Sequence, residues 1–257
     1  MIKDKVIMIT GASSGIGALT ARKLAQRGAV PVLCARSLEK LEQASAAIAG
    51  SHGRYVLDVT DEKGVNETVA QIMKRYGRID ALINNAGFGR FKPFMDAPIG
   101  DFSEMMNTNY MGIVRCTKAV LPHMAARGQG HIVNIASMAG KIGTPKSTGY
   151  TASKHAVLGL TNALRHELRG SGVFVSAVNP GPIDTPFFEQ ADPSGSYVRN
   201  VKRFMMTPDK VADRIAGIIE RPRAELDLPW LAAAGIKLYQ LFPRLADRIA
   251  GPMLDRK

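Results

Sequence analysis

Short apolar runs alternate with longer amphipathic stretches along most of this chain. The apolar runs are about four to eight residues long and rich in valine, isoleucine and leucine, which is typical of buried β-strands. They occupy residues 6–9, 29–34, 54–57, 79–83, 132–136, 172–178 and 224–228. The stretches between them carry apolar side chains at helical spacing, at residues 15–27, 38–49, 61–76, 103–127, 150–168 and 208–220. This alternation predicts an α/β fold with a doubly wound, mostly parallel seven-stranded sheet in a three-layer α/β/α arrangement.

The pattern changes after the sixth apolar run. Clear periodicity is lost from about 182 to 207, although this segment keeps several aromatic and methionine side chains. A long irregular segment inside a compact domain is usually functional, so we expect a mobile loop that covers an apolar substrate pocket. Phe88, Phe91 and Phe94 either line the same cavity or only pack in the core.

A helical tail is predicted from about 230 to 255. Leu238 and Leu241 recur at helical spacing, Pro243 interrupts the pattern, and Lys237 and Arg244 flank it. Such a helix covers the protein's own core, closes the pocket, meets a second subunit or lies on an anionic membrane. Internal burial is the commoner outcome, so peripheral membrane contact through the tail is the less expected one.

Composition favours a single domain over residues 1–257, because 257 residues with 46% hydrophobic content can bury one large core. Lysine and arginine number 34 against 22 acidic residues, which gives a net charge of +12. The basic residues are spread along the chain without a nucleic-acid motif. A solvated surface and one polyanionic cofactor explain this charge, and no nucleic-acid partner is expected.

The cellular compartment is read from the N-terminal residues, the hydropathy and the cysteines. The chain begins with charged residues, and no apolar run approaches the ~18 residues that cross a bilayer. Cys34 and Cys116 lie in apolar surroundings, which favours reduced core thiols over a disulfide. The five histidines show no metal-binding spacing with them. We therefore expect a cytoplasmic protein without a metal site.

A glycine-rich turn joins the first predicted strand to the first predicted helix. Its glycines permit a tight bend and a close approach of the backbone to a ligand, while amides at the helix start attract a phosphate. A turn without a ligand is the alternative, but the position between strand and helix favours nucleotide binding. The expected cofactor contacts are Gly11, Ser13, Ser14, Gly15, Ile16 and Gly17.

The end of the second strand bears on cofactor choice. Sites selective for NAD usually place an acidic residue there, about 20 residues after the glycine turn, to bind the ribose 2′-hydroxyl. This chain has Ala35 and Arg36 instead. A guanidinium pairs with a 2′-phosphate in fork geometry, so NADP is favoured and NAD is less expected. The alternative is that Arg36 is an ordinary exposed residue.

Three reactive side chains follow the fifth strand. Ser137 stands directly after that strand, at the end that borders the ligand crevice in an open α/β sheet. Tyr150 and Lys154 are four residues apart on a predicted helix and therefore share a face. The ammonium is expected to lower the pKa of the phenol and make it a proton donor near neutral pH. A chance pairing on the helix and a serine that merely ends a strand are the alternatives.

Taken in order, these motifs resemble the short-chain dehydrogenase/reductase family over about residues 5–227. The family's glycine turn matches residues 10–17, and its Asn-Asn-Ala-Gly element matches 84–87. The resemblance implies a Rossmann-type fold and a catalytic set of Asn109, Ser137, Tyr150 and Lys154. It also implies cofactor contacts at Asp58, Val59, Asn85, Ala86, Gly87, Tyr150, Lys154, Pro180, Gly181, Ile183 and Thr185. NADP-dependent members often carry a basic residue where this chain has Ser14, so Arg36 would bind the 2′-phosphate with help from serine hydroxyls.

The resemblance implies NADPH-dependent reduction of a ketone or aldehyde, which the apolar loop predicts to be hydrophobic. Tyr150 would act as general acid, Ser137 would hold the carbonyl oxygen, and Asn109 would support a water relay that connects Lys154 to solvent. A homodimer or homotetramer is implied as well. The alternatives are an NAD(P)-linked alcohol dehydrogenase in the oxidative direction and a non-catalytic protein that senses NADP.

Overall fold

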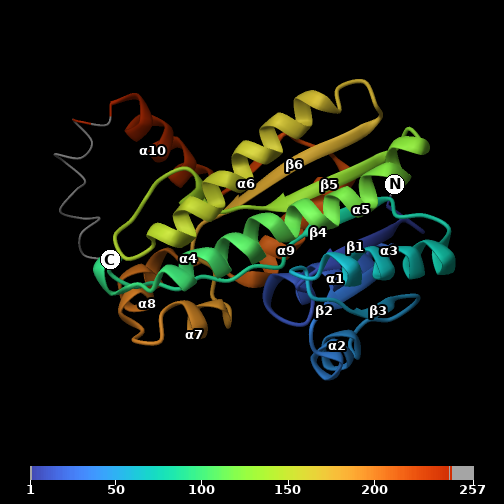
Figure 1. The fold of residues 1–257 in the computed structure, drawn as a ribbon, viewed down its shortest axis with the longest axis horizontal. Coiled ribbons are helices and arrows are strands. Elements are labelled where there is room, and N and C mark those ends of the chain that lie inside the picture. Colours follow the sequence, from blue (N-terminus) through green and yellow to red (C-terminus); the bar gives the residue numbers. More distant parts are fainter. Residues whose placement is uncertain (1, 243, 245–257) are drawn as a thin grey trace.

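Seven parallel strands form one sheet in the computed structural model, which describes residues 2–242 and residue 244 (Figure 1). The strand order is β3-β2-β1-β4-β5-β6-β7. The strands are β1 (Val6–Thr10), β2 (Val30–Ala35), β3 (Gly53–Val56), β4 (Ala81–Asn84), β5 (Gly130–Ile135), β6 (Val173–Pro180) and β7 (Glu225–Leu228). The chain moves outward from β1 to β3 and then crosses to β4, and such a reversal places a ligand crevice at the carboxyl ends of the strands. The predicted doubly wound sheet is confirmed.

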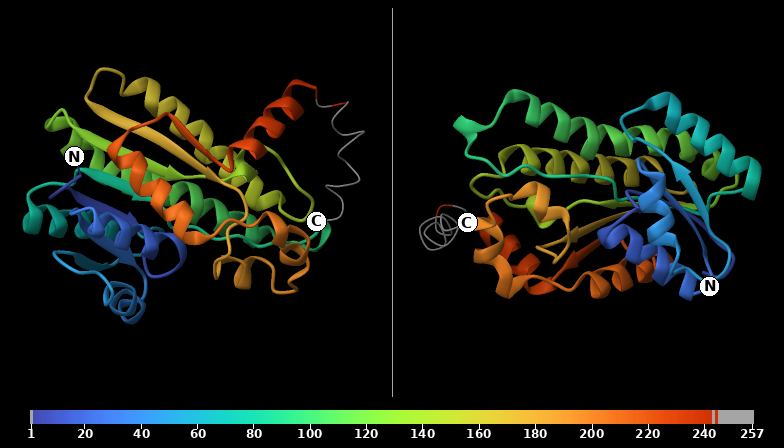
Figure 2. Two further views of the ribbon diagram at one scale, coloured as in Figure 1. Left: turned by 180° about the vertical axis from the view of Figure 1, so that it is seen from behind. Right: turned by 90° about the horizontal axis from the view of Figure 1, so that it is seen from below.

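Helices cover both faces of this sheet (Figure 2). One face is covered by α1 (Gly15–Gln26), α2 (Leu38–Ser45) and α9 (Pro208–Glu220), and the other by α3 (Glu62–Tyr76), α5 (Gly112–Ala126) and α6 (Thr148–Glu167). Ile7 and Ile9 of β1 pack into the first of these cores, and Met8 packs into the second. Successive side chains of a strand point to opposite faces, so a strand covered on both sides is apolar throughout.

The remaining elements follow β4, β5, β6 and β7. They are η1 (Phe94–Asp96), α4 (Ile99–Met106), the π-helical turn η2 (Asn107–Met111), η3 (Met138–Gly140), α7 (Phe187–Ala191), α8 (Ser196–Val201), η4 (Lys202–Phe204) and α10 (Trp230–Leu241). α7, α8 and η4 lie within the irregular segment expected from about 182 to 207, so part of that segment is helical. Each of these elements has six residues or fewer, which is too short for a 3.6-residue period to appear in the sequence.

Two predicted helices differ from the observed ones. The helix expected over 38–49 ends at Ser45. The helix expected from 103 begins at Ile99, and η2 interrupts it before α5 continues. The tail helix runs from Trp230 to Leu241, whereas residues 243 and 245–255 of the predicted tail lie outside the described residues. No helix in the described part of the chain is long and apolar enough to cross a membrane.

Candidate active site

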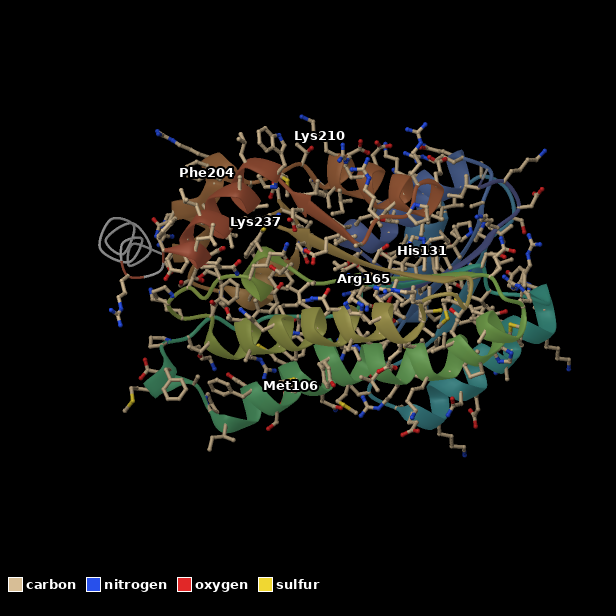
Figure 3. The ribbon with its side chains drawn as sticks, turned by 90° about the horizontal axis from the view of Figure 1, so that it is seen from above. Met106, His131, Arg165, Phe204, Lys210 and Lys237 are labelled. Atoms are coloured by element: carbon tan, nitrogen blue, oxygen red, sulfur yellow. The ribbon has the colours of Figure 1, made fainter. Side chains whose placement is uncertain are left out.

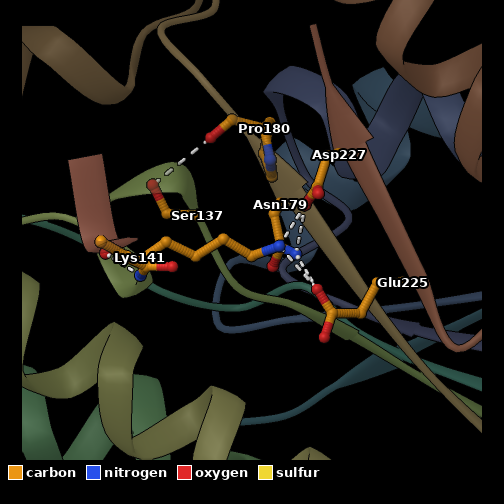
Figure 4. Close-up of polar contacts among 7 residues, drawn as sticks. Ser137, Lys141, Asn179, Pro180, Glu225 and Asp227 are labelled. Carbon is orange, nitrogen blue, oxygen red and sulfur yellow. Dashed lines mark hydrogen bonds and ion pairs between the residues drawn. The ribbon is translucent and has the colours of Figure 1, made fainter. Parts of the chain in front are cut away.

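Ser137 lies immediately beyond β5, at the edge where the strands end. Its backbone is extended, and its side-chain oxygen caps η3 by accepting a 3.0 Å hydrogen bond from the amide of Ala139. The hydroxyl also donates a long hydrogen bond of 3.4 Å to the carbonyl oxygen of Pro180, at the end of β6 (Figure 4). Contacts with two neighbouring segments therefore fix the position of this hydroxyl.

Tyr150 and Lys154 lie in the first two turns of α6 and face the end of β5. The Lys154 Nζ donates a 2.8 Å hydrogen bond to the carbonyl oxygen of Ile135 and lies 5.7 Å from the centre of the Tyr150 ring. The Tyr150 hydroxyl is hydrogen-bonded to Ser137. α6 approaches η3 closely because Gly140 has no side chain: a Cβ there would lie 2.7 Å from the Lys154 carbonyl oxygen. The three predicted reactive groups thus meet at one place.

Burial dominates the proton affinities of this pair. It raises the pKa of the Tyr150 phenol to about 12, which the hydrogen bond with Ser137 only partly offsets, and the nearby Tyr197 raises it further. Burial also lowers the pKa of the Lys154 ammonium to about 8. The expected net lowering of the Tyr150 pKa is therefore wrong for this arrangement. Removal from water disfavours the phenolate more strongly than its neighbours favour it, and the sequence does not reveal the depth of burial.

Asn109 is fully buried in the π-helical turn η2. Its side-chain oxygen accepts a 2.9 Å hydrogen bond from the Phe88 amide, and its nitrogen donates 2.9 Å hydrogen bonds to the Phe88 carbonyl and to Ser153 Oγ. A Cβ at Gly87 would lie 2.9 Å from the same side-chain oxygen. The Asn109 amide therefore fixes the segment after β4 against α6.

The glycine turn is tied to the end of β4. Thr10 Oγ1 accepts 3.0 Å hydrogen bonds from the amides of Asn85 and Ala86, and Asn85 Nδ2 donates to the carbonyls of Thr10 and Gly11. Gly11 has a left-handed φ of 65°, and a Cβ there would lie 2.8 Å from Ala86 Cα. A Cβ at Gly17 would lie 2.5 Å from Asn85 Nδ2. Only glycine fits these contacts, so the turn presents bare backbone.

The start of α1 has the features of an anion site. Ser14 precedes the helix without using its side chain as a cap, and the first turn carries no acidic residue. Amides of a first helical turn lack partners within the helix and lie at the positive end of its dipole. Ser13, Ser14, Gly15 and Ile16 line a cavity of about 1860 Å³. These residues fit the pyrophosphate of a dinucleotide.

Two cations and one carboxylate border the same cavity near the end of β2. Arg36 and Lys40 line it, both are exposed, and neither forms an ion pair with a described residue. Lys40 was not predicted from the sequence, although its place four residues after Arg36, in the first turn of α2, is a usable signal. Asp58 accepts hydrogen bonds from the amide and hydroxyl of Thr60 through one carboxylate oxygen, at 2.9 and 2.7 Å.

Aromatic rings surround Tyr150 on the other side of the cavity. The Phe91 and Phe187 ring centres lie 5.8 and 5.6 Å from that of Tyr150, and Tyr197 lies 5.0 Å from Phe91. Phe88 and Phe91 line the cavity, so for these two residues the alternative of packing only in the core is wrong. Phe94 does not: it is 65% exposed and packs on a neighbouring ring of α4. Further apolar lining that the sequence did not indicate comes from Met138, Ile142, Leu231, Ile236 and Tyr239.

Lys141 anchors the segment that follows η3. Its Nζ lies 2.6 Å from a carboxylate oxygen of Glu225 and 2.7 Å from one of Asp227, both on β7 (Figure 4). Asn179 Nδ2 donates to the same two carboxylates at 3.3 and 2.8 Å, and Gln240 of α10 donates to the Lys141 carbonyl at 2.8 Å. Burial lowers the pKa of Lys141, but its hydrogen bonds with the two carboxylates outweigh burial and the pKa is raised. This ion cluster joins the Ser137 loop to β6, β7 and α10.

The cavity gathers nearly all predicted site residues. Gly17 and Asn109 do not line it, because they pack behind its wall. The lining residues from the predicted set are Gly11, Ser13, Ser14, Gly15, Ile16, Arg36, Asp58, Val59, Asn85, Ala86, Gly87, Ser137, Tyr150, Lys154, Pro180, Gly181, Ile183 and Thr185. Among the described residues, no group of three or more histidine, cysteine or acidic side chains is placed to hold a metal ion.

Comparisons with family models, curated sequences and solved structures all indicate the same family. Residues 5–194 match the short chain dehydrogenase family. An uncharacterized oxidoreductase, YxnA of Bacillus subtilis, is 36% identical over 96% of this chain and 72% of its own length. A short-chain dehydrogenase from Streptomyces avermitilis superposes with a TM-score of 0.83 and 28% identity over 98% of this chain and 97% of its own.

A ketoreductase supplies a further structural match. The structure of a variant actinorhodin polyketide ketoreductase with NADPH superposes with a TM-score of 0.80 and 32% identity, over 89% of this chain and 97% of its own. The sheet order, the glycine turn and the Ser-Tyr-Lys cluster agree with these likenesses. This chain belongs to the short-chain dehydrogenase/reductase family and is an oxidoreductase of that family.

Proposed function

We propose that this protein reduces a hydrophobic ketone or aldehyde to an alcohol with NADPH. One observation carries the proposal: the cavity that holds Ser137, Tyr150 and Lys154 is continuous with the glycine turn and the start of α1. A proton donor and a dinucleotide cradle in one cavity are what hydride transfer to a carbonyl group requires. The ketoreductase neighbour with NADPH supports the same direction.

The chain's own residues supply binding and proton transfer. The nicotinamide supplies the hydride to the carbonyl carbon when the cofactor is bound. The Ser137 hydroxyl donates a hydrogen bond to the carbonyl oxygen, and Tyr150 transfers its phenolic proton to the same oxygen. Its raised pKa keeps Tyr150 protonated at neutral pH, so the acid is present before reaction.

Lys154 stabilises the phenolate that proton transfer leaves behind. It is buried with a single described partner, the Ile135 carbonyl, and its pKa of about 8 keeps it mainly charged at neutral pH. Its charge near the Tyr150 ring favours the phenolate in a poorly solvated site. Asn109 has its side chain committed to Phe88 and Ser153, so its proposed part is to hold the relay water through its backbone.

The preference for NADP over NAD is attributed to the two cations that follow β2. Arg36 and Lys40 border the cavity without acidic partners among the described residues, and Ser37 lies between them. A guanidinium and an ammonium on one side of the ribose bind a 2′-phosphate through charge-assisted hydrogen bonds. An NAD-selective carboxylate is absent from this position, since residues 35–37 are alanine, arginine and serine.

The substrate compartment favours a flat apolar compound. Phe91, Phe187 and Tyr197 form an aromatic wall beside Tyr150, while Met138 and Ile142 add apolar lining near α10. Apolar ligands gain affinity from such walls mainly through buried area and ring packing. Aromatic or cyclic ketones are therefore the first compounds to assay.

Replacing Tyr150 with phenylalanine tests the reaction. Turnover with NADPH and an active ketone from a panel of aliphatic, cyclic and aromatic carbonyl compounds should fall by about 10² to 10⁴. NADPH binding, followed by cofactor fluorescence, should persist because the cradle is intact. Tyr55→Phe, on β3 outside the cavity, is the matched control and should behave as the parent enzyme. Undiminished turnover in Y150F would reject Tyr150 as the acid.

Replacing Arg36 with aspartate tests the cofactor assignment. The ratio of kcat/KM for NADPH to that for NADH should fall about 10- to 100-fold, because a charged hydrogen bond is lost and a repulsive charge is added. Lys40→Ala should lower the same ratio by a smaller factor. Arg221→Asp, which makes the same change of charge away from the cavity, controls for long-range effects. An unchanged ratio in R36D would reject the role of Arg36.

A further inference from the structure

α10 turns an apolar face outward. Trp230, Leu238 and Leu241 are 71%, 61% and 72% exposed, and their spacing places them on one face of the helix. Ala233 and Ile236 lie on the other side, where they pack with Met138 at the cavity wall. A surface helix of a globular protein normally shows the reverse pattern, with its apolar face inward. We call Trp230, Leu231, Leu238 and Leu241, with the exposed Phe242 directly after the helix, the outer face of α10.

This face is continuous with the rim of the substrate cavity. Leu231 lines the cavity and is 65% exposed, and across the opening Phe204 of η4 lines it and is 73% exposed. Phe204 and Lys237 lie toward the same end of the molecule, opposite His131 (Figure 3). The mouth of the cavity is thus bordered by solvent-facing apolar side chains on two sides.

The charged residues in the two sequence segments that carry these apolar side chains all have one sign. The sequence contains no acidic residue between Asp192 and Asp209, or between Asp227 and Asp247. The cations in these two segments are Arg199, Lys202, Arg203, Lys237 and Arg244. Lys202, Arg203 and Lys237 are exposed and form no ion pair within the part of the chain that the structure describes.

We propose that the outer face of α10, together with η4, docks on an anionic phospholipid surface. Exposed tryptophan and leucine side chains flanked by lysine and arginine are the chemistry that inserts into the headgroup region of such a membrane. A second copy of this chain would bring the same cations against one another, which disfavours it as the occupant. Docked in this way, the cavity mouth opens toward the membrane, where hydrophobic carbonyl compounds concentrate. The docking itself does not depend on the proposed reaction.

Trp230 is the only tryptophan of the chain, so the full-length native protein reports on this contact. Vesicles of phosphatidylcholine with phosphatidylglycerol should shift its emission to shorter wavelength, and brominated phosphatidylcholine in those vesicles should quench it. Vesicles of phosphatidylcholine alone should bind weakly, and salt should weaken binding to the anionic vesicles. Emission that stays unchanged with anionic vesicles would overturn the proposal.

Substitutions separate insertion from general attraction of a basic protein. Leu238→Ser with Leu241→Ser keeps Trp230 as reporter and should lower the partition constant about tenfold or more. Phe174→Ser is the matched control: Phe174 is 59% exposed, but it packs beside His131 at the far end of the molecule, and its variant should bind as the parent does. Equal binding by the leucine double variant would overturn the proposal. So would a vesicle-free, concentration-dependent emission shift that accompanies dimer formation in sedimentation, because that result assigns the face to a second copy.

Discussion

Replacing Lys154 with methionine should stabilise the fold while it removes activity. Lys154 is 5% exposed, and burial lowers its pKa from 10.5 to about 8. Below about pH 8 the folded and the unfolded chain both carry the proton, so the folded state bears the full cost of a buried ammonium. The pKa difference corresponds to roughly 3 kcal/mol. Methionine has a similar unbranched stem and no charge.

The substitution also leaves the Ile135 carbonyl without its donor, which costs about 1 kcal/mol. The variant should therefore exceed the parent in unfolding free energy by about 2 kcal/mol at neutral pH. Between the folded pKa of about 8 and the unfolded value of 10.5, the unfolded chain binds the proton that the folded protein has released. Over that interval the unfolding free energy of the parent rises with pH relative to that of K154M, and the greater stability of K154M disappears.

Urea unfolding followed by far-ultraviolet circular dichroism, repeated from about pH 7 to about pH 10, measures this difference. Lys118→Met, on the exposed side of α5, is the matched control and should show no such pH dependence. A K154M variant less stable than the parent at neutral pH, or a stability difference that does not change with pH, would contradict this prediction.

Three further predictions concern charge and backbone. Lys141→Met should lower the unfolding free energy by about 2 to 4 kcal/mol in urea titration, because it leaves two part-buried carboxylates of β7 unpaired, and arginine at this position should restore most of the loss. The hydrogen bond with Lys92 lowers the pKa of the Asp101 carboxyl. The Asp101 carboxylate therefore stabilises the fold fully above pH 3.8, its ordinary pKa, and this stabilisation is lost as pH falls through the lower pKa of the folded protein. In an acid titration, the unfolding free energies of the parent and of Asp101→Asn should converge below that lower pKa. Gly11→Ala should weaken NADPH binding in a fluorescence titration, whereas Gly128→Ala, with a φ of 62° and open space around it, should cost only stability.

Features that depend on residues close together in the sequence could be predicted from it. The strands appear as continuous apolar runs because helices cover both faces of the sheet. The glycine turn could be recognised because left-handed backbone and close approach at Gly11 exclude other residues. The proximity of Ser137, Tyr150 and Lys154 could be predicted, because the end of a strand and one face of a helix determine where these side chains point.

Features that depend on long-range packing could not be predicted. Lys141 meets Glu225 and Asp227 from more than eighty residues away, and no local pattern connects them. The direction of the Tyr150 pKa shift follows from burial beneath aromatic rings of α7 and α8, which were too short to show a period. Phe94 was grouped with Phe91 by composition alone, although only Phe91 faces the cavity.

The anchor of Lys141 bears on how this enzyme can be re-engineered. The family match ends at residue 194, yet the two carboxylates that Lys141 holds belong to β7, beyond that limit. A chimera that carries a foreign segment after residue 194 would leave the Lys141 ammonium, four residues after Ser137, without its two carboxylates. A transplanted C-terminal segment should therefore fold well on this framework only when it brings an acidic pair to the positions of Glu225 and Asp227.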